Sequence, residues 1–191
     1  MTLLVDLDNT LADHHGQLWD DLREKYDIHL DSSLSAYDFD TDSHPDIKQA
    51  IVEITTQPGW WKNLPRLEGA LEVISYARHL NYDVHIVSKA PYNKPLAWTE
   101  KVEWCREQQE LRGVPINLVS DKSLFRGDVL YDDYEPYVAS WLLKNPNGLG
   151  VIPKETSNSG TFLPGSDRMF TLRYEDVKSL LKDLKPPCVY R

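Results

Sequence analysis

The sequence contains few of the residues that would place it outside a reducing compartment or inside a membrane. It has two cysteines in 191 residues, Cys105 and Cys188, and isolated thiols are typical of cytoplasmic proteins, not of disulfide-stabilised secreted domains. No run approaches the roughly 18 apolar residues of a membrane-spanning helix, and the N-terminus lacks the basic and apolar segments of a targeting peptide. We therefore expect a cytoplasmic protein without a membrane partner.

Positive charge is also scarce. The chain has 21 Lys and Arg against 30 Asp and Glu, for a formal net charge of −9 at pH 7. Such a chain is not attracted to nucleic-acid polymers or anionic membranes by its overall field. A single phosphorylated small molecule remains compatible, because a metal ion and a few local cations can offset its charge. The hydrophobic content of 41% is ordinary for one globular domain.

Short apolar segments alternate with helical patterns along most of the chain. The segments that resemble buried strands are 2–8, 82–88, 116–120, 128–133 and 148–153. Apolar residues at helical spacing predict helices at 68–81, 94–111, 135–145 and 174–184, and the polar stretch 154–168 predicts a loop. This alternation predicts an α/β fold with a Rossmann-like, doubly wound parallel sheet. Ligands bind such sheets at the carboxyl ends of the strands.

The region after the first strand departs from this alternation. Helical patterns at 14–26 and 45–57 flank a segment rich in Asp and Ser. An insertion of about fifty residues is too long for an ordinary loop. We therefore expect a small helical cap at 14–65, inserted into a core formed by 1–13 and 66–191.

Polar side chains gather at the expected carboxyl edge of the sheet. In chain order these are Asp6, Asp8, Ser88, Lys122 and the pair Asp132–Asp133. Residues two apart on an extended strand point to the same side, so Asp6 and Asp8 can face one site. Crowded carboxylates raise each other's pKa values unless a cation lies among them, and oxygen ligands suit Mg²⁺. We expect a magnesium site, with Ser88 and Lys122 binding a phosphoryl group.

Two other carboxylate sites fit these residues less well. An EF-hand calcium loop would have glycine where Leu11 stands. A response-regulator receiver would carry its phosphoaccepting aspartate at the end of the third strand, which here ends in Ser120. Both alternatives are therefore disfavoured.

Four motifs together resemble those of the haloacid dehalogenase-like (HAD) phosphohydrolases. They are VDLDNTLAD at 5–13, HIVS at 85–88, SDK at 120–122 and LYDD at 130–133. Within that superfamily, PGWWKNLPRLEGALEVI at 58–74 and DKSLFRGDVLYDD at 121–133 are similar to the 5′(3′)-deoxyribonucleotidases. The resemblance spans nearly the whole chain. It implies a HAD-like core and a magnesium-dependent phosphatase that acts on a nucleoside monophosphate, with deoxyribonucleotides as the expected class.

The resemblance also implies a division of roles among the carboxylates. Asp6 would be the nucleophile that forms an aspartyl-phosphate, and Asp8 would be the general acid and then the general base. Mg²⁺ would be bound by the carboxylate of Asp6, the backbone carbonyl of Asp8 and the carboxylate of Asp133, which the family pattern favours over Asp132. Thr10 is expected to orient the loop and not to take part in catalysis.

Phosphate binding is expected from Ser88 and Lys122. Two lysines near the second motif, Lys89 and Lys94, compete with Lys122 for this role, and Lys122 is favoured. Lys89 is kept as a substrate-binding candidate.

Aromatic residues of the cap are the candidates for substrate recognition. Trp60 and Trp61 could stack on a nucleobase, which is worth roughly 1–3 kcal/mol per base, or could pack the cap on the core. His14 occupies the position where the resembled family has an aromatic near the substrate, and a solvent-facing helix histidine is the alternative. Tyr37 and Phe39 lie where that family has base-pocket aromatics.

Three other outcomes remain open from the sequence. The enzyme could act on a different small phosphate ester. A noncatalytic binding module of the same fold is disfavoured, because no required catalytic residue type is missing. Both a monomer and a homodimer are compatible with the sequence.

Overall fold

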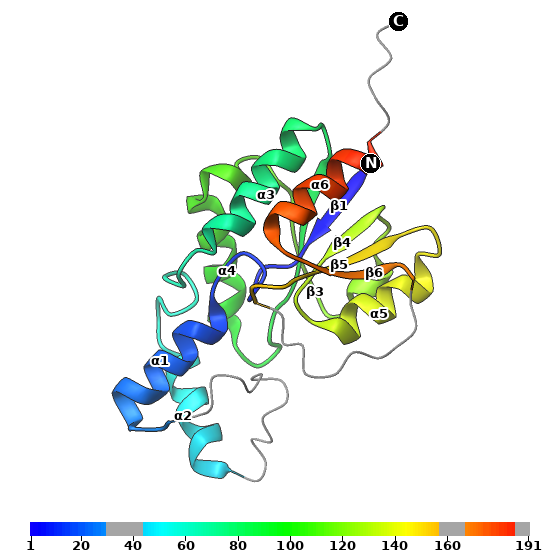
Figure 1. Cartoon of the computed structure of the whole chain (residues 1–191). Helices are drawn as coiled ribbons and strands as arrows, with labels where there is room; N and C mark the ends of the chain where they lie inside the picture. Colours follow the sequence, from blue (N-terminus) through cyan, green and yellow to red (C-terminus); the bar gives the residue numbers. More distant parts are fainter. Residues whose placement is uncertain (30–43, 157–166, 186–191) are drawn as a thin grey trace, which may run out of the picture.

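Six parallel strands form a single sheet in the computed structural model, which describes residues 1–29, 44–156 and 167–185. The strand order is β3-β2-β1-β4-β5-β6 (Figure 1). The strands are β1 (Thr2–Val5), β2 (Asp83–Lys89), β3 (Ile116–Val119), β4 (Val129–Tyr131), β5 (Leu149–Pro153) and β6 (Met169–Leu172). The predicted α/β class with a Rossmann-like parallel sheet is confirmed.

Helices cover both faces of this sheet because alternate strand residues point to opposite sides. The helices that follow or connect the strands are α3 (Glu68–His79), α4 (Pro95–Glu107), α5 (Glu135–Lys144) and α6 (Tyr174–Leu184). Two short 3-10 turns are η1 (Gln109–Leu111) and η2 (Lys122–Leu124). Leu3 and Val5 of β1 belong to the larger core, which α3, α4 and α6 share. Leu4, between them, joins the smaller core with Val138 and Trp141 of α5.

Three elements differ from the prediction: the first strand, the helix expected at 94–111, which ends at Glu107 and is followed by η1, and the segment after β5. The first strand ends at Val5, because the Leu7 carbonyl accepts the amides of Leu11 and Ala12 at 2.8 and 2.9 Å and so turns the chain. The segment 154–168, predicted as a loop, is followed by the strand β6 at the edge of the sheet, which the sequence did not indicate. Four half-buried residues are too few to show a strand pattern in the sequence.

Two helices are inserted between β1 and α3. The helices α1 (His14–Tyr26) and α2 (Pro45–Thr55) contact each other and project to one side of the sheet in Figure 1. The chain enters and leaves this pair through two adjacent links, in which Asp13 N donates to Pro65 O at 2.8 Å and Leu67 N donates to Leu11 O at 2.9 Å. Both helices fall within the expected cap at 14–65; Tyr37 and Phe39 lie outside the described residues.

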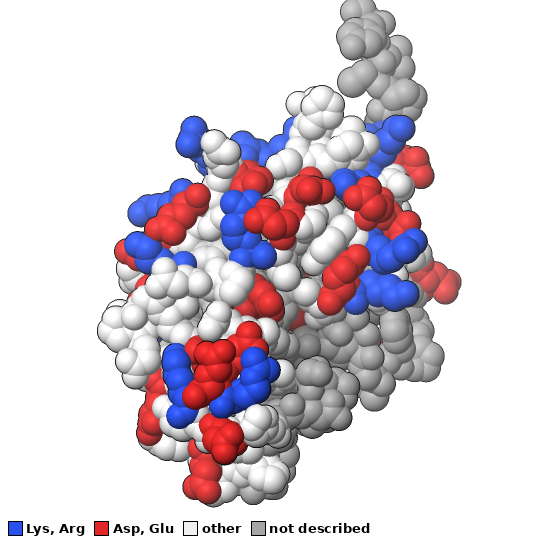
Figure 2. Space-filling model, turned by 60° about the vertical axis from the view of Figure 1, so that its left-hand side comes forward, with Lys and Arg blue, Asp and Glu red and all other residues white. Residues whose placement is uncertain are grey.

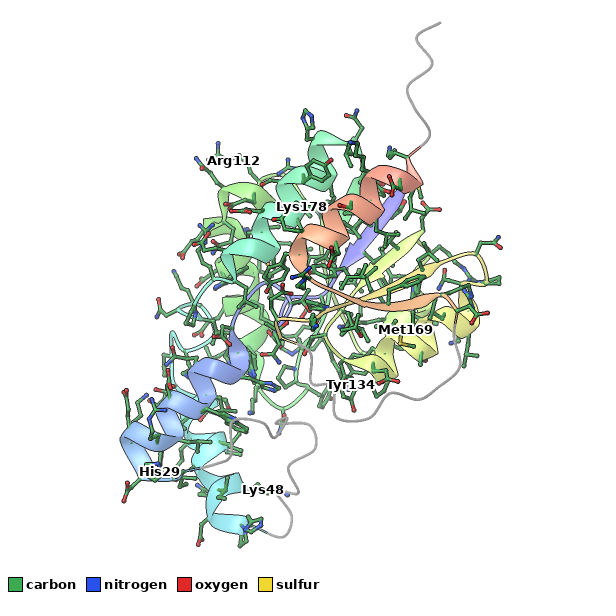
Figure 3. All side chains as sticks on the ribbon, viewed as in Figure 1. His29, Lys48, Arg112, Tyr134, Met169 and Lys178 are labelled. Carbon is green, nitrogen blue, oxygen red and sulfur yellow. The ribbon has the colours of Figure 1, made fainter. Side chains whose placement is uncertain are left out.

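Acidic and basic side chains are interspersed over the face of the molecule shown in Figure 2. Figure 3 shows His29 and Lys48 at the outer end of the helical pair, away from Met169 at the sheet edge.

Within the described residues, none of the helices is both long and apolar enough to span a bilayer. Cys105 is buried, and burial raises its pKa to about 12; Cys188 lies outside the described residues.

Candidate active site

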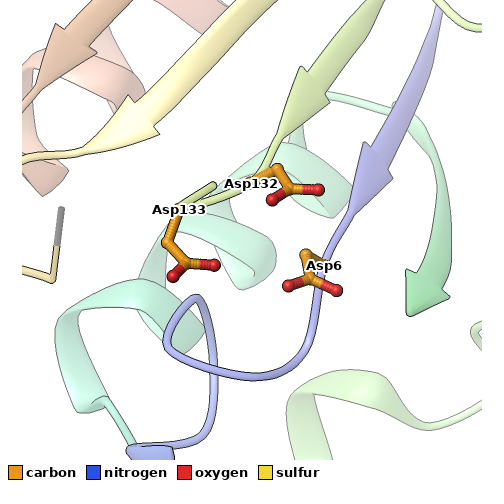
Figure 4. Close-up of side chains that lie close together, drawn as sticks. All are labelled: Asp6, Asp132 and Asp133. Carbon is orange, nitrogen blue, oxygen red and sulfur yellow. The ribbon is translucent and has the colours of Figure 1, made fainter. Parts of the chain in front are cut away.

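Three carboxylates meet where β1 and β4 end. Asp6 follows β1, and Asp132 and Asp133 follow β4, its neighbour in the sheet. Each offers an oxygen that lies within 4.8 Å of the oxygens of the other two, and all three residues are buried (Figure 4). The parallel pairing of β1 with β4 therefore brings residues about 125 positions apart into one acidic cluster.

Lys122 is the cation of this cluster. Its Nζ lies 2.7 Å from Asp6 Oδ1 and 2.6 Å from Asp132 Oδ2, and its side chain is only 3% exposed. Burial alone would lower the pKa of Lys122, but Asp132 and Asp6 outweigh it and raise the pKa above its usual value. Lys122 therefore stays charged beside Asp6.

One lysine does not offset three buried carboxylates. Burial raises the pKa of Asp132 to about 6 even though Lys122 opposes the shift. Burial and the charges of Asp6 and Asp132 raise the pKa of Asp133 well above its usual value. A divalent cation would remove this repulsion, and buried carboxylate oxygens are the donors that Mg²⁺ prefers. The residues present fit the metal that the sequence led us to expect.

Thr10 ties the loop after β1 to the same cluster. Its hydroxyl accepts a hydrogen bond from Asp133 N at 3.1 Å and donates one to Asp133 Oδ1 at 3.4 Å. The Thr10 side chain is fully buried. Thr10 therefore holds the loop that carries Asp6 and Asp8 against the end of β4, in agreement with the orienting role predicted for it.

Lys101 is a second buried lysine at the site, and the sequence did not single it out. Its Nζ donates to Asp8 Oδ2 at 2.5 Å, to the carbonyl of Lys89 at 2.7 Å and to Ser88 Oγ at 3.5 Å. Only 1% of Lys101 is exposed. Lys101 thus joins Asp8, in the loop after β1, and the fully buried Ser88, near the end of β2, at one ammonium group.

A signal for Lys101 does exist in the sequence. In the helical pattern of 94–111 it stands on the same face as Ala97, Trp104 and Cys105, which are buried. A lysine on the apolar face of a helix is rarely buried unless it has a partner. That partner is Asp8, which lies 93 positions away, and periodicity within one helix cannot identify it.

Trp60, Trp61 and His14 form an aromatic cluster beside Lys101. The indoles are 8% and 4% exposed, and their N–H groups donate to Asp21 Oδ2 at 2.7 Å and to Thr55 O at 2.9 Å. The His14 ring centroid lies 5.2 Å from that of Trp60 and 5.0 Å from that of Trp61. The two indoles therefore lie among α1, α2 and α4, with His14 of α1 against both.

His14 is not a solvent-facing helix residue. Its Nδ1 is buried without a hydrogen-bond partner among the described residues. Burial, and then the charges of His15, Lys101 and Lys94, hold the pKa of His14 well below its usual value. The imidazole is therefore neutral at pH 7.

The neutral His14, whose Nδ1 is buried, makes stability depend on pH. In the unfolded chain the His14 imidazole binds a proton near pH 6.5, whereas in the folded chain it does so only at lower pH. Its contribution to stability is therefore present above pH 6.5 and is lost as the pH falls. The expected contribution is about 1 kcal/mol between pH 7 and pH 5.5. His14→Phe keeps an aromatic ring and should remove this part of the pH dependence of the unfolding free energy in urea. The exposed His79→Gln is the control, and an unchanged slope in His14→Phe would contradict the prediction.

Among the described residues, neither of the two competing lysines forms a salt bridge with these carboxylates. Lys89 is exposed and donates to Tyr137 Oη at 2.9 Å, beside a hollow of about 470 Å³ that Lys122 also lines. Lys94 donates to the Thr55 hydroxyl at the end of α2. Of the three candidates, Lys122 is therefore the one that contacts Asp6.

A comparison with models of protein families identifies the family of this chain. The model of the family described as 5′ nucleotidase, deoxy (Pyrimidine), cytosolic type C protein matches residues 1–152. The chain belongs to this family. The resemblance indicated by the sequence motifs is thereby confirmed, and the chain is a 5′-nucleotidase-like hydrolase of phosphomonoesters.

Individual relatives and structures agree with this family. A provisionally named 5′(3′)-deoxyribonucleotidase of Bordetella bronchiseptica is 28% identical over 137 residues, which cover 70% of this chain and 74% of that protein. A protein of the same provisional name from Staphylococcus aureus is 26% identical over 136 residues, which cover 69% and 73%.

Solved structures share the fold of this nucleotidase-like chain at low identity. A HAD family hydrolase from Deinococcus radiodurans R1 has a TM-score of 0.58 and 17% identity over 95% of each chain. A provisionally named haloacid dehalogenase-like hydrolase from Burkholderia xenovorans LB400 has a TM-score of 0.50 and 16% identity over 93% of this chain and 96% of that one.

Proposed function

We propose that this chain is a magnesium-dependent phosphatase that hydrolyses nucleoside monophosphates, with deoxyribonucleotides as the expected class, through an aspartyl-phosphate. One observation carries the proposal: Asp6 lies at the end of β1 beside the charged Lys122 and within a cluster of buried carboxylates. This arrangement places a carboxylate nucleophile in a site that also attracts a phosphoryl group.

Mg²⁺ would be held by the carboxylates of Asp6 and Asp133 and by the carbonyl of Asp8. Asp132 is engaged by Lys122 at 2.6 Å, which leaves Asp133 as the better second carboxylate ligand. The bound metal would offset the charge of the phosphoryl oxygens.

The first chemical step would form a bond from an Asp6 carboxylate oxygen to phosphorus. The bond from phosphorus to the leaving oxygen breaks, and Asp8 donates a proton to that oxygen. Water then attacks the phosphorus of the aspartyl-phosphate while Asp8 takes a proton from it, which releases phosphate and restores Asp6. Proton transfer from a positioned side chain is worth about 10²- to 10⁴-fold in rate.

Two lysines and a serine would bind the phosphoryl oxygens. Lys122 approaches from the end of β3, Ser88 from the end of β2 and Lys101 from α4. Each lysine is paired with aspartate in the structure, Lys122 with Asp6 and Asp132 and Lys101 with Asp8. A phosphate group bound between Lys122 and Lys101 would accept hydrogen bonds from both ammonium groups, which would also keep their contacts with the aspartates.

The substrate class is proposed from the cap. We take residues 14–65 as the cap and His14, Trp60, Trp61 and Lys89 as substrate contacts. The first three support this because they cluster beside Lys101. A cytoplasmic location remains a prediction from the sequence, with which both a monomer and a homodimer are compatible.

A panel of substrates tests the function. We expect release of phosphate from deoxyribonucleoside 5′- and 3′-monophosphates with Mg²⁺, loss of activity in EDTA and recovery when Mg²⁺ is restored. Sugar phosphates and p-nitrophenyl phosphate should be hydrolysed with a lower kcat/KM. Equal rates for all esters would contradict the nucleotide specificity but not the phosphatase activity.

A further inference from the structure

Glu100 is a buried carboxylate outside the reaction centre. It is 6% exposed and stands next to Lys101 in α4. Its two oxygens accept the backbone amides of Gly59 at 2.7 Å and Trp61 at 3.1 Å. Among the described residues, no basic side chain forms a salt bridge with it. The charge of Glu100 is therefore offset by the amides of the connector, which we define as residues 57–65 between α2 and α3.

The connector carries Trp61 to a defined place. The indole N–H of Trp61 donates to Thr55 O at 2.9 Å, and the backbone N–H of Trp61 donates to Glu100. Its ring then lies over the Lys101 ammonium, with Nζ 4.9 Å from the ring centroid. An indole in this position attracts the ammonium and keeps water from it.

Two adjacent residues of α4 thus hold two different segments of the site. Lys101 holds Asp8, and Glu100 holds the connector whose indole covers Lys101. We propose that Glu100 is a positioning residue that sets Trp61 over Lys101, and thereby makes Lys101 a dry, strongly attracting partner for the substrate phosphate. This inference rests on the proposed function, because it takes Lys101 to bind phosphate.

The replacement Glu100→Gln tests the contact with little change in shape. The glutamine oxygen can accept one of the two amides, but its NH₂ group faces the other amide and cannot accept it. The connector should move, and Trp61 should leave Lys101 exposed to water. A hydrated ammonium attracts an anion less strongly than a dry one, and we expect about a tenfold loss of phosphate affinity.

Glu103→Gln is a matched control on the same helix. Glu103 is half-exposed and also bridges to the connector, with its Oε2 3.4 Å from Lys62 Nζ. The replacement changes the same charge and breaks a surface contact between the same two segments. Surface pairs contribute little, so its phosphate affinity should equal that of the wild type.

The measurement is the Kd of inorganic phosphate with saturating Mg²⁺, obtained by calorimetry on the whole folded chain. We expect Glu100→Gln to bind about tenfold more weakly, with kcat/KM for a nucleotide reduced in parallel. Trp61→Leu leaves the Glu100 contacts in place and should weaken phosphate binding as much, and the double variant should be no weaker than either single one. Trp61→Leu also provides the test if Glu100→Gln does not fold.

The outcomes separate this inference from the proposed function. Wild-type affinity in Glu100→Gln or in Trp61→Leu, or additive losses in the double variant, would overturn the positioning role while the phosphatase activity stands. A wild-type chain that neither binds phosphate nor hydrolyses phosphate esters would overturn both.

Discussion

Asp6→Asn should reduce hydrolysis of every phosphate ester by about 10³-fold or more. Asparagine has the shape of aspartate but lacks the carboxylate that attacks phosphorus, so no aspartyl-phosphate can form. The measurement is kcat/KM for a deoxyribonucleoside monophosphate and for p-nitrophenyl phosphate, with Mg²⁺ present. The same fold loss is expected for both, since the defect lies in the chemical step and not in recognition of the leaving group.

Stability provides the second readout for Asp6→Asn. The charge of Asp6 contributes to the raised pKa of Asp133. Asp6 is also one of the two carboxylate partners of Lys122. Removing its charge relieves repulsion while Lys122 keeps Asp132, so the thermal midpoint should stay near that of the wild type or rise. Asp20→Asn, at an exposed pair with Arg23, is the control for activity. Equal activity of Asp6→Asn and Asp20→Asn would exclude the proposed nucleophile.

Lys101→Met should lower both activity and stability. Methionine fills much of the same volume, but it leaves Asp8 without the ammonium at 2.5 Å and removes a proposed phosphate ligand. Breaking a buried ion pair in this way is expected to lower the free energy of unfolding by about 3 kcal/mol. We expect kcat/KM to fall by about 10²-fold or more, a size typical of losing one preorganised donor to a developing charge.

The control for Lys101→Met is Lys62→Met. Lys62 forms surface pairs with Glu103 and Glu107 at 3.4 and 3.3 Å, and such pairs contribute less than about 1 kcal/mol. Urea unfolding and phosphate release are measured on both variants, with activity expressed per folded molecule. If Lys101→Met loses stability but keeps its activity per folded molecule, the lysine is structural and does not bind the substrate.

The sequence by itself determined the sheet and its reacting edge. Apolar segments that end in Asp6, Ser88 and Asp132–Asp133 predict parallel strands whose carboxyl ends meet, because the helical segments between them provide the crossovers. The same logic brought Lys122 to Asp6, which the 2.7 Å contact shows. The strand β6 was missed, because four half-buried residues carry too weak a pattern.

Only the tertiary structure decided which charges pair across the site. The sequence shows Glu100 and Lys101 as two members of a charged helix, and helical spacing places Lys101 on the buried face but does not identify a partner for either residue. Their partners, Asp8 and the amides of Gly59 and Trp61, come from other elements tens of residues away. Periodicity reports which face of a helix is buried, whereas the partner of a buried charge depends on how the helix packs in three dimensions. The strand-end carboxylates were therefore visible in the sequence, whereas the pairing of Lys101 with Asp8 was not.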